Sequence, residues 1–273
     1  MIYLYAYTNH KKNLDNLRRI VALYKTLQEQ NINSEILIND YRAQLLLKDW
    51  GLPLATTIET IKDIDAVASN EDIIIIDSPE EIEGKVINYP KKFKAVIYLN
   101  SSCKEVEFQG ATIFNIFLDN NLIFTKEKEQ KRDKEAIFIY GDSDYDKTIL
   151  KNSEIFKNKN LDLYWGVYFF VKYEDKLAKI FNNIIESEEY YDILIKYQKI
   201  ITSSMQIAIE ARANGAFVEF LELKKIDNCY KEILNKYNIK ITKIINNTDN
   251  LALDNIKINN TNNKIINIIK SYV

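Results

Sequence analysis

The sequence has little glycine and little histidine, with six glycines and one histidine among 273 residues. Loops that wrap phosphates use glycine so that backbone N–H groups can approach the anion, and many metal and general-base sites use histidine. No glycines are spaced as in G-x-G-x-x-G or G-x-x-x-x-G-K, so the common phosphate loops are absent. The abundance of Ile, Lys and Asn is typical of an AT-rich genome, whose codon bias offers a second explanation for the scarcity of glycine.

Cysteine and long apolar runs are also scarce. Cys103 and Cys229 are too few for a disulfide framework and belong to no C-x-x-C pair, so we expect both to be core thiols in a reducing compartment. No stretch of about 18 uninterrupted apolar residues occurs, and the N-terminus begins with a strand-like run rather than a signal peptide. These patterns predict a cytoplasmic protein without a membrane span.

Neither sign of charge dominates the chain. Its 37 basic and 39 acidic side chains leave a formal charge of −2, which supplies no overall field for a polyanion, so we expect no nucleic-acid partner. With 47% hydrophobic and 28% charged residues, the chain can bury a substantial core. Its length fits one large domain or two of roughly 130 residues each, and we favour two.

Short β-rich runs alternate with amphipathic segments, which predicts parallel sheets covered by helices. The clearest helix is expected over 13–30, where apolar residues recur at three- and four-residue spacing, and a second is expected over 41–50. In the first half of the chain, strands are expected at 2–7, 34–38, 72–77, 95–99 and 112–117.

A charge-dense stretch, 125–135, separates this half from the next. It is typical either of a solvated helix or of a link between domains, and its position favours the link. After it, strands are expected at 136–140, 162–170, 199–202 and 217–223. The tail is expected to form a helix over 226–237, a strand over 239–244, an Asn-rich loop over 246–263 and a closing helix over 264–272.

The sequence therefore predicts an α/β fold of two Rossmann-like lobes facing across a cleft. The N-terminal lobe is expected over residues 1–132, and the C-terminal lobe, with its Asn-rich tail, over 133–273. Ligands of such folds bind at the carboxyl ends of the strands.

Two strand-to-helix junctions in the second half carry the chemical signal. One is I-F-I-Y-G-D-S-D at 137–144, and the other is I-I-T-S-S-M-Q-I-A-I-E-A-R-A-N-G-A at 200–216. At both, a helix N-terminus meets the end of a strand, where N–H groups and the helix dipole favour an anion such as diphosphate. A simpler interpretation makes Ser203 or Ser204 a helix N-cap.

The order and spacing of these motifs resemble the UDP-sugar hydrolase of the pseudaminic acid pathway, a relative of GT-B glycosyltransferases such as the enzyme that adds N-acetylglucosamine to lipid-linked peptidoglycan precursors. In that family a strand leads into Gly-Gly-x-Asp. Here Gly141, Ser143 and Asp144 fit this pattern, and Asp142 replaces the second glycine. The resemblance spans about residues 1–223.

The family's later stretch is Gly-Gly-Ser-x-x-x-Glu-x-x-x-x-Gly, which holds the nucleotide diphosphate and ribose. Glu210 and Gly215 match its end, but its two glycines fall on Ser204 and Met205. By this resemblance Glu210 would hold ribose. The residues assigned to substrate binding are Gly141, Asp142, Ser143, Ser203, Ser204, Met205, Glu210 and Arg19.

The first strand departs from the family's pattern. There it leads into Gly-Phe-Gly-His-x-x-Arg, whose histidine activates water. When Arg19 is aligned with that arginine, Asn16 is aligned with the histidine. An amide cannot remove a proton from water at neutral pH. The candidate bases here are His10, which lies just after the first strand, Asp15 and Asp77. Each has a plainer interpretation, as an exposed turn residue, a helix cap and a turn former respectively.

The resemblance implies binding of a UDP-sugar in the interdomain cleft, with hydrolysis or glycosyl transfer for pseudaminic acid, flagellar or surface glycans. The alternative is a catalytically inactive GT-B-like scaffold or interaction subunit, which would have a protein partner. No cofactor and no metal is expected: Asp142, Asp144 and Asp146 have the spacing of an EF-hand start, but no Gly stands at the sixth position of such a loop. Tyr190, Tyr191 and Trp165 could stack on a ligand, although core packing is the commoner use of such residues.

Overall fold

The computed structural model describes residues 1–119, 122–125, 132–245 and 263–272. Their contacts divide the chain into two compact units. The first unit groups Met1–Asn9, Asn16–Phe124 and Asn260–Val273, and the second groups His10–Asp15 and Thr125–Asn259. The expected boundary at residue 132 lies close to one of these divisions. However, the loop 10–15 falls with the second unit and the C-terminal segment with the first, so neither unit is a continuous stretch of sequence.

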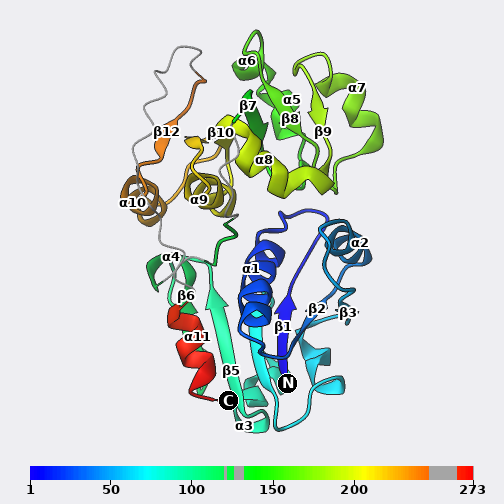
Figure 1. The fold of residues 1–273 in the computed structure, drawn as a ribbon, viewed down its shortest axis with the longest axis vertical. Coiled ribbons are helices and arrows are strands. Elements are labelled where there is room, and N and C mark those ends of the chain that lie inside the picture. Colours follow the sequence, from blue (N-terminus) through cyan, green and yellow to red (C-terminus); the bar gives the residue numbers. More distant parts are fainter. Residues whose placement is uncertain (120–121, 126–131, 246–262, 273) are drawn as a thin grey trace. The chain divides into compact units, whose positions relative to one another are not determined.

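The first unit contains a six-stranded parallel sheet in the order β3-β2-β1-β4-β5-β6 (Figure 1). Because the order reverses between β1 and β4, the carboxyl ends of these two neighbouring strands form a topological switch point. The strands are β1 (Ile2–Ala6), β2 (Ser34–Ile38), β3 (Thr56–Thr57), β4 (Ile73–Asp77), β5 (Ala95–Asn100) and β6 (Thr112–Asn115).

Helices connect these strands. The longest is α1, whose apolar stripe of Leu17, Ile20, Val21 and Leu27 is fully buried, as the three- and four-residue spacing predicts. The run Ile73–Ile76 is also buried throughout, which is typical of a central strand covered on both faces. The helices are α1 (Asp15–Glu29), α2 (Tyr41–Asp49), α3 (Tyr89–Lys92), α4 (Ile116–Asp119) and α11 (Asn263–Lys270), with 3-10 turns η1 (Ile61–Ala66) and η2 (Gly84–Asn88).

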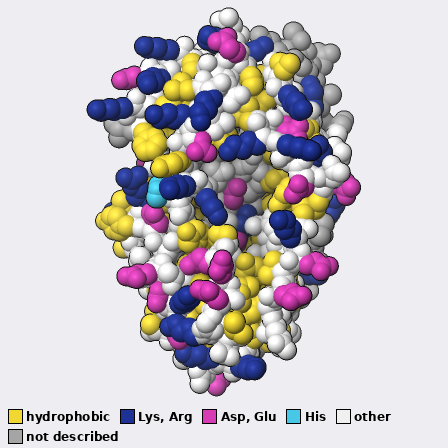
Figure 2. Space-filling view, turned by 180° about the vertical axis from the view of Figure 1, so that it is seen from behind, with side chains coloured by type: hydrophobic (Ala, Val, Ile, Leu, Met, Phe, Trp, Pro, Cys, Tyr) yellow, Lys and Arg dark blue, Asp and Glu magenta, His cyan; other side chains and the backbone are white. Residues whose placement is uncertain are grey.

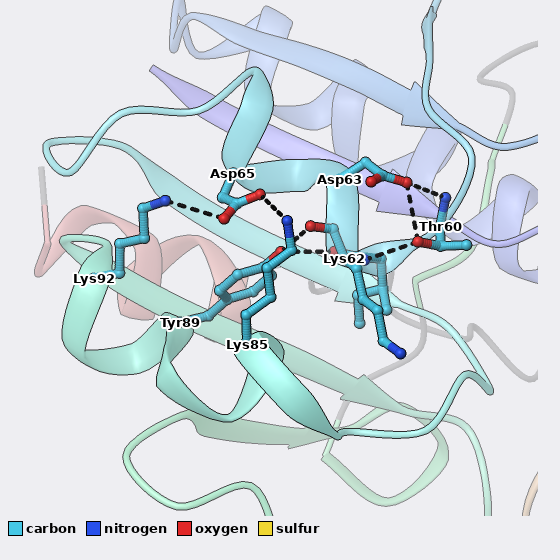
Figure 3. A network of polar contacts seen from close by, with 8 residues as sticks. Thr60, Lys62, Asp63, Asp65, Lys85, Tyr89 and Lys92 are labelled. Atoms are coloured by element: carbon cyan, nitrogen blue, oxygen red, sulfur yellow. Dashed lines mark hydrogen bonds and ion pairs between the residues drawn. The ribbon is translucent and has the colours of Figure 1, made fainter.

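A polar network fastens η1 to η2 and α3 (Figure 3). Asp65 accepts from both Lys85 and Lys92, at 2.7 and 3.2 Å, and the hydroxyl of Tyr89 donates to two carbonyl oxygens of η1. At the start of η1, Thr60 and Asp63 form a reciprocal capping box. The lysines of this network are exposed and its charges are already paired, so we regard the network as structural.

The second unit repeats the architecture. Its parallel sheet has the order β12-β11-β10-β7-β8-β9, which is the order of the first sheet, and its switch point lies between β7 and β10. The strands are β7 (Lys134–Ile139), β8 (Asp162–Tyr164), β9 (Ile184–Ile185), β10 (Tyr197–Thr202), β11 (Phe217–Leu221) and β12 (Lys240–Thr242). The predicted pair of Rossmann-like α/β lobes is therefore confirmed.

The described helices of the second unit are short, at four to nine residues each. Its core is rich in aromatic residues, with Phe138 of β7 packed against Phe156 and Phe181 at ring-centroid distances of 4.6 and 6.2 Å. The helices are α5 (Thr148–Lys151), α6 (Ser153–Phe156), α7 (Glu174–Leu177), α8 (Tyr190–Lys196), α9 (Met205–Ala213) and α10 (Asn228–Lys236), with 3-10 turns η3 (Val171–Tyr173) and η4 (Ser187–Glu189).

The strand expected over 162–170 is wrong beyond Tyr164. The chain turns at Gly166, which lies so close to the Asp142 backbone that a Cβ there would stand 2.4 Å from the Asp142 carbonyl oxygen. Tyr168 then donates its N–H to that same carbonyl at 3.0 Å. The aromatic and β-branched residues after Gly166 therefore pack in a turn rather than a strand. The edge strands β3 and β9, each of two residues, were not predicted.

Other boundaries shift by a few residues. The strand expected over 112–117 ends at Asn115, where α4 begins, and β7 starts at Lys134, inside the expected linker. Arg132, from the same charged stretch, is half-buried and donates to the carbonyl oxygens of Leu194, Tyr197 and Asn214, whereas residues 133–135 after it are exposed. Residues 126–131 and most of the Asn-rich loop, 246–262, lie outside the described residues.

The cysteine expectation is also wrong. Neither Cys103 nor Cys229 is a free thiol, since both are disulfide-bonded. The cysteines therefore give no support to a reducing compartment. Within the described ranges, every helix is too short or too polar to cross a bilayer.

Candidate functional site

The turns after β7 and β10 stand side by side at the switch point of the second sheet. Ile139, the last residue of β7, is in register with Thr202, the last residue of β10, so the two following turns leave the same edge. Gly141 begins the first turn with φ of 145°, in the region that favours glycine. A Cβ at this position would stand 2.1 Å from Oδ1 of Asn13, so the close approach also requires glycine.

Asp142, which follows Gly141 in the first turn, is a buried structural carboxylate. Its side chain is fully buried, and its two oxygens accept from the Tyr164 hydroxyl at 3.0 Å and from the Leu14 N–H at 2.9 Å. Its own N–H donates to Oδ1 of Asn13 at 3.2 Å. A buried carboxylate needs such donors because desolvation penalises its charge. Asp142 therefore fixes the loop 10–15 to the turn.

The next two residues also form bonds within the unit. Ser143 donates its hydroxyl to the carbonyl oxygen of His10 at 2.7 Å. Asp144 accepts the N–H groups of Thr148 and Ile149 at 2.6 and 3.0 Å, and so satisfies the start of α5. It also accepts from the Tyr173 hydroxyl, and burial together with this bond raises the pKa of Tyr173 above its ordinary value.

Ser204 is the N-cap of α9, as the simpler interpretation of the sequence holds. Its hydroxyl oxygen accepts from the Ile207 N–H at 3.2 Å, and the hydroxyl donates to Oδ2 of Asp15 at 2.9 Å. Ser203 donates instead to the Leu221 carbonyl oxygen at 2.8 Å, and Met205 is the first residue of the helix. The positive end of α9 therefore has a carboxylate of the chain itself beside its cap.

Glu210 lies one and a half turns into α9 and is fully buried. Its oxygens accept from the Tyr190 hydroxyl at 2.5 Å and from the Gln206 side chain at 3.0 Å. The Tyr190 ring packs edge-on against that of Tyr164, which holds Asp142. The buried carboxylates of Asp142 and Glu210 are thus held by two tyrosines in contact, and Tyr190 serves packing rather than an exposed stacking surface.

In the first unit, Asp77 and Arg19 form a buried ion pair at the switch point between β1 and β4. Asp77 is the last residue of β4, and its Oδ2 and Oδ1 accept from Arg19 Nε and Nη2 at 2.7 and 2.9 Å. Arg19 also donates to Oδ1 of Asn16 at 2.7 Å, and Asn16 donates to the Asp77 carbonyl at 3.1 Å. The guanidinium therefore binds a carboxylate of the protein.

The turn after Asp77 is ordered by Glu80, which the sequence analysis did not single out. Its carboxylate accepts from the hydroxyls of Tyr5 and Ser78 at 2.7 and 2.8 Å and from the Ile61 N–H at 3.2 Å. The Tyr98 hydroxyl donates to the Ser78 carbonyl, and burial raises the pKa of Tyr98 to about 12. Tyr98 therefore stays a neutral donor at physiological pH.

His10 is exposed and lies against Tyr145, with a centroid distance of 6.0 Å and an edge-on geometry. The next residue, Lys11, has its Nζ 4.9 Å from the centre of the Tyr145 ring. Among the candidate bases, His10 accepts the Ser143 hydroxyl only through its backbone carbonyl oxygen, whereas Asp15 accepts the Ser204 hydroxyl through its side-chain carboxylate. The roles of Asn13 and Leu14 carried no sequence signal, because one acts through an ordinary amide side chain and the other through its backbone.

On the face drawn in Figure 2, basic and acidic side chains are interspersed rather than segregated. Within the described residues, no three His, Cys, Asp or Glu side chains are grouped so that they could hold a metal ion.

Comparisons with known proteins bear on the fold. No protein-family model matches the sequence, and no curated protein sequence is similar to it. Among solved structures, the UDP-GlcNAc 2-epimerase of Methanocaldococcus jannaschii, in complex with UDP-GlcNAc and UDP, is similar with a TM-score of 0.62 and 13% identity. The match covers 100% of this chain and 99% of that chain.

Two further structures extend the comparison. A Listeria monocytogenes protein assigned as a UDP-N-acetylglucosamine 2-epimerase gives a TM-score of 0.50 at 11% identity, over 81% of this chain and 78% of that chain. The Escherichia coli heptosyltransferase WaaC with ADP gives 0.47 at 8% identity, over 99% and 98%, and we draw nothing from so low a score. With the strand order of both sheets, the match to the Methanocaldococcus structure identifies the fold as GT-B-like, built from two Rossmann-type α/β lobes.

Proposed function

We propose that the protein binds a nucleoside diphosphate sugar, a UDP-sugar, at the carboxyl edge of its second sheet. The observation that carries the proposal is the meeting of two motif turns, 141–143 and 203–205, at the switch point between β7 and β10. Ligands of doubly wound sheets bind at this point. The similar Methanocaldococcus structure is a complex with UDP-GlcNAc and UDP, which supports the same class of ligand for this chain.

The chemistry of the two turns suits a diphosphate. The turn at Gly141 brings a backbone N–H group to the strand end, and the turn at Ser204 begins a nine-residue helix whose positive end favours an anion. Glu210, at the spacing of the family motif, is the proposed ribose ligand. Because its carboxylate is fully buried and bonded to Tyr190 and Gln206, ribose binding would require these side chains to move.

If the protein is an enzyme, we propose attack on the anomeric carbon of the sugar. The bond from that carbon to the diphosphate oxygen breaks, its electron pair leaves with UDP, and the proton of the attacking water or acceptor hydroxyl passes to a base. Donors at the two turns would stabilise the departing charge. Asp15 is the best placed base, since Asp77 is bound through both oxygens to Arg19 and His10 lies against Tyr145. The pseudaminic acid pathway and a cytoplasmic location stay predictions.

One observation favours a second candidate, a catalytically inactive binding or scaffold subunit. The Asp142 N–H and the hydroxyls of Ser143 and Ser204 are all bonded within the chain. In a protein that no longer binds a nucleotide sugar, these donors would stay bonded to the chain at all times. UDP release from UDP-GlcNAc separates the candidates, because the scaffold releases none, and a transferase releases UDP only after an acceptor is added.

Binding is tested by thermal unfolding of the full chain with UDP, UDP-GlcNAc and CMP. Ligand at 100 times its dissociation constant stabilises a protein by about 2.7 kcal/mol, so UDP and UDP-GlcNAc should raise the unfolding temperature and CMP should not. Ser204→Ala should weaken the UDP response, whereas Asp40→Ala, which removes the cap of α2 in the first unit, should lower stability and leave the response unchanged. A flat response to both uridine nucleotides contradicts the proposal.

A further inference from the structure

The loop His10–Asp15 bonds to the groups that the proposed function gives to the nucleotide. His10 accepts the Ser143 hydroxyl through its carbonyl oxygen, Asn13 accepts the Asp142 N–H, and Asp15 accepts the Ser204 hydroxyl, at 2.7, 3.2 and 2.9 Å. These donors lie on both turns of the switch point. A hydrogen already donated to the loop is not available to a ligand.

The loop also fills the space beside Gly141. Glycine at a phosphate site lets an anion approach the backbone, but here Oδ1 of Asn13 lies 2.1 Å from the place where a Cβ would stand. Asn13 therefore lies where a phosphate oxygen would approach the turn. Its amide oxygen takes the place of that phosphate oxygen as the acceptor for the Asp142 N–H.

Charge supports the same interpretation. The cap of α9 favours an anion, and the group it meets is the Asp15 carboxylate. Two further contacts hold the loop. The Leu14 N–H donates to the buried Asp142 carboxylate, and the Leu14 side chain is itself fully buried. At the other end of the loop, Lys11 lies over the Tyr145 ring.

We infer that this loop is a built-in competitor of the nucleotide, in which Asn13 and Asp15 occupy the diphosphate position and must leave before a nucleoside diphosphate binds. The inference rests on the proposed function. Release of the loop from Ser204 would also make the Asp15 carboxylate available as the base. A site that is open only a fraction of the time binds more weakly by that fraction, so a loop seated for 99% of the time weakens affinity about 100-fold.

The first test measures UDP affinity of the full chain by calorimetry. Asp15→Asn removes the competing charge, and Asn13→Ala removes the side chain above Gly141. Each variant should lower the dissociation constant for UDP by about tenfold or more. The upper limit is the factor by which the seated loop weakens binding in the wild type. Asp49→Asn is the matched control, because it removes one negative charge from an exposed position of the first unit and should leave the affinity within about twofold.

The second test follows the loop by hydrogen exchange. The Leu14 N–H, bonded to Asp142, should be protected in the ligand-free chain and lose protection at saturating UDP. Wild-type affinity in both loop variants, or a Leu14 N–H that stays protected with UDP bound, overturns the inference while the proposed function stands. If neither the wild type nor either variant binds UDP, the proposed function fails and the inference fails with it.

Discussion

Arg19 and Asp77 form an ion pair with two contacts, Nε to Oδ2 at 2.7 Å and Nη2 to Oδ1 at 2.9 Å, and each side chain is only 2% exposed. The pair stands at the switch point of the first sheet, where the sequence predicted a candidate catalytic base and a substrate-binding arginine. Its burial makes the pair a structural element whatever further role it has. Removal of one partner leaves the other charge desolvated.

We therefore expect Arg19→Ala to lower the free energy of unfolding by about 3–5 kcal/mol, measured by urea denaturation, because the Asp77 carboxylate loses its counter-charge in a buried site. Lys85→Ala is the control. It breaks an ion pair with Asp65 in which the lysine is 51% exposed, so its cost should stay below about 1 kcal/mol. Equal losses in the two variants would contradict the structural role of the Arg19–Asp77 pair.

Gly141→Ala should destabilise the protein more than Gly51→Ala. Both glycines have positive φ, so each alanine is strained by about 1–2 kcal/mol, but only the new Cβ at Gly141 meets another group, the Asn13 side chain. The additional loss of stability in Gly141→Ala, relative to Gly51→Ala, should shrink when Asn13→Ala is combined with it. Thermal unfolding of the single and double variants measures this coupling. Additive effects would show that Asn13 does not crowd Gly141.

Tyr190→Phe removes a hydroxyl donor from the buried Glu210 carboxylate and leaves the ring in place. Hydrogen bonds to charged groups contribute about 1.5–3 kcal/mol, so we expect a loss of that size in the free energy of unfolding. Tyr41→Phe, at a tyrosine that is 67% exposed, is the control and should cost less than about 0.5 kcal/mol. A neutral Tyr190→Phe would mean that Glu210 is held by other donors.

Glu186 gives a pH-dependent prediction. Burial, and then Glu188, Glu174 and Glu189, raise the pKa of its carboxyl above the ordinary value of 4.5. The folded chain thus binds this proton more tightly than the unfolded chain does. Ionisation of Glu186 therefore lowers the free energy of unfolding. This loss of stability is absent below pH 4.5, grows as the pH rises through the folded pKa, and is complete at neutral pH.

Glu186→Gln should therefore stabilise the protein at pH 7, by no more than about 0.5 kcal/mol because the group is largely exposed and water screens the repulsion. At pH 3 the variant and the wild type should be equally stable. Urea midpoints at the two pH values provide the measurement, and a gain of equal size at both would exclude charge as its cause.

Much of the fold could be predicted from the sequence because its strands and main helices carry regular patterns. The run Ile73–Ile76 indicated a central strand, and the stripe of α1 indicated its buried face. The prediction over 162–170 went wrong because β-forming residues there obey a tertiary constraint, the contact of Gly166 with the Asp142 backbone. No local pattern contains that contact.

The candidate site was partly predictable for a similar reason. Gly141 and Ser204 lie at strand-to-helix junctions, which a sequence displays, and the structure brings their strands together. The partners of these residues come from distant positions: Asn13 and Asp142 are 129 residues apart, and Asp15 and Ser204 are 189 apart. Hydrogen bonds over such separations depend on the completed fold, so residues chosen by motif could be placed but not given their bonding partners.

The first unit includes both ends of the chain, since α11 belongs to it together with β1. In the first unit α11 lies beside β6 (Figure 1), and its residues Ile265, Ile266 and Ile269 are buried. The hydroxyl of Tyr272, just after α11, lies 3.0 Å from that of Thr112 in β6. Because α11 follows the whole second unit in sequence, the hydrophobic core of the first unit stays incomplete until the residues of this helix have been synthesised. Loss of α11 would therefore expose apolar surface of the first unit, the kind of surface that makes incompletely folded chains prone to aggregate.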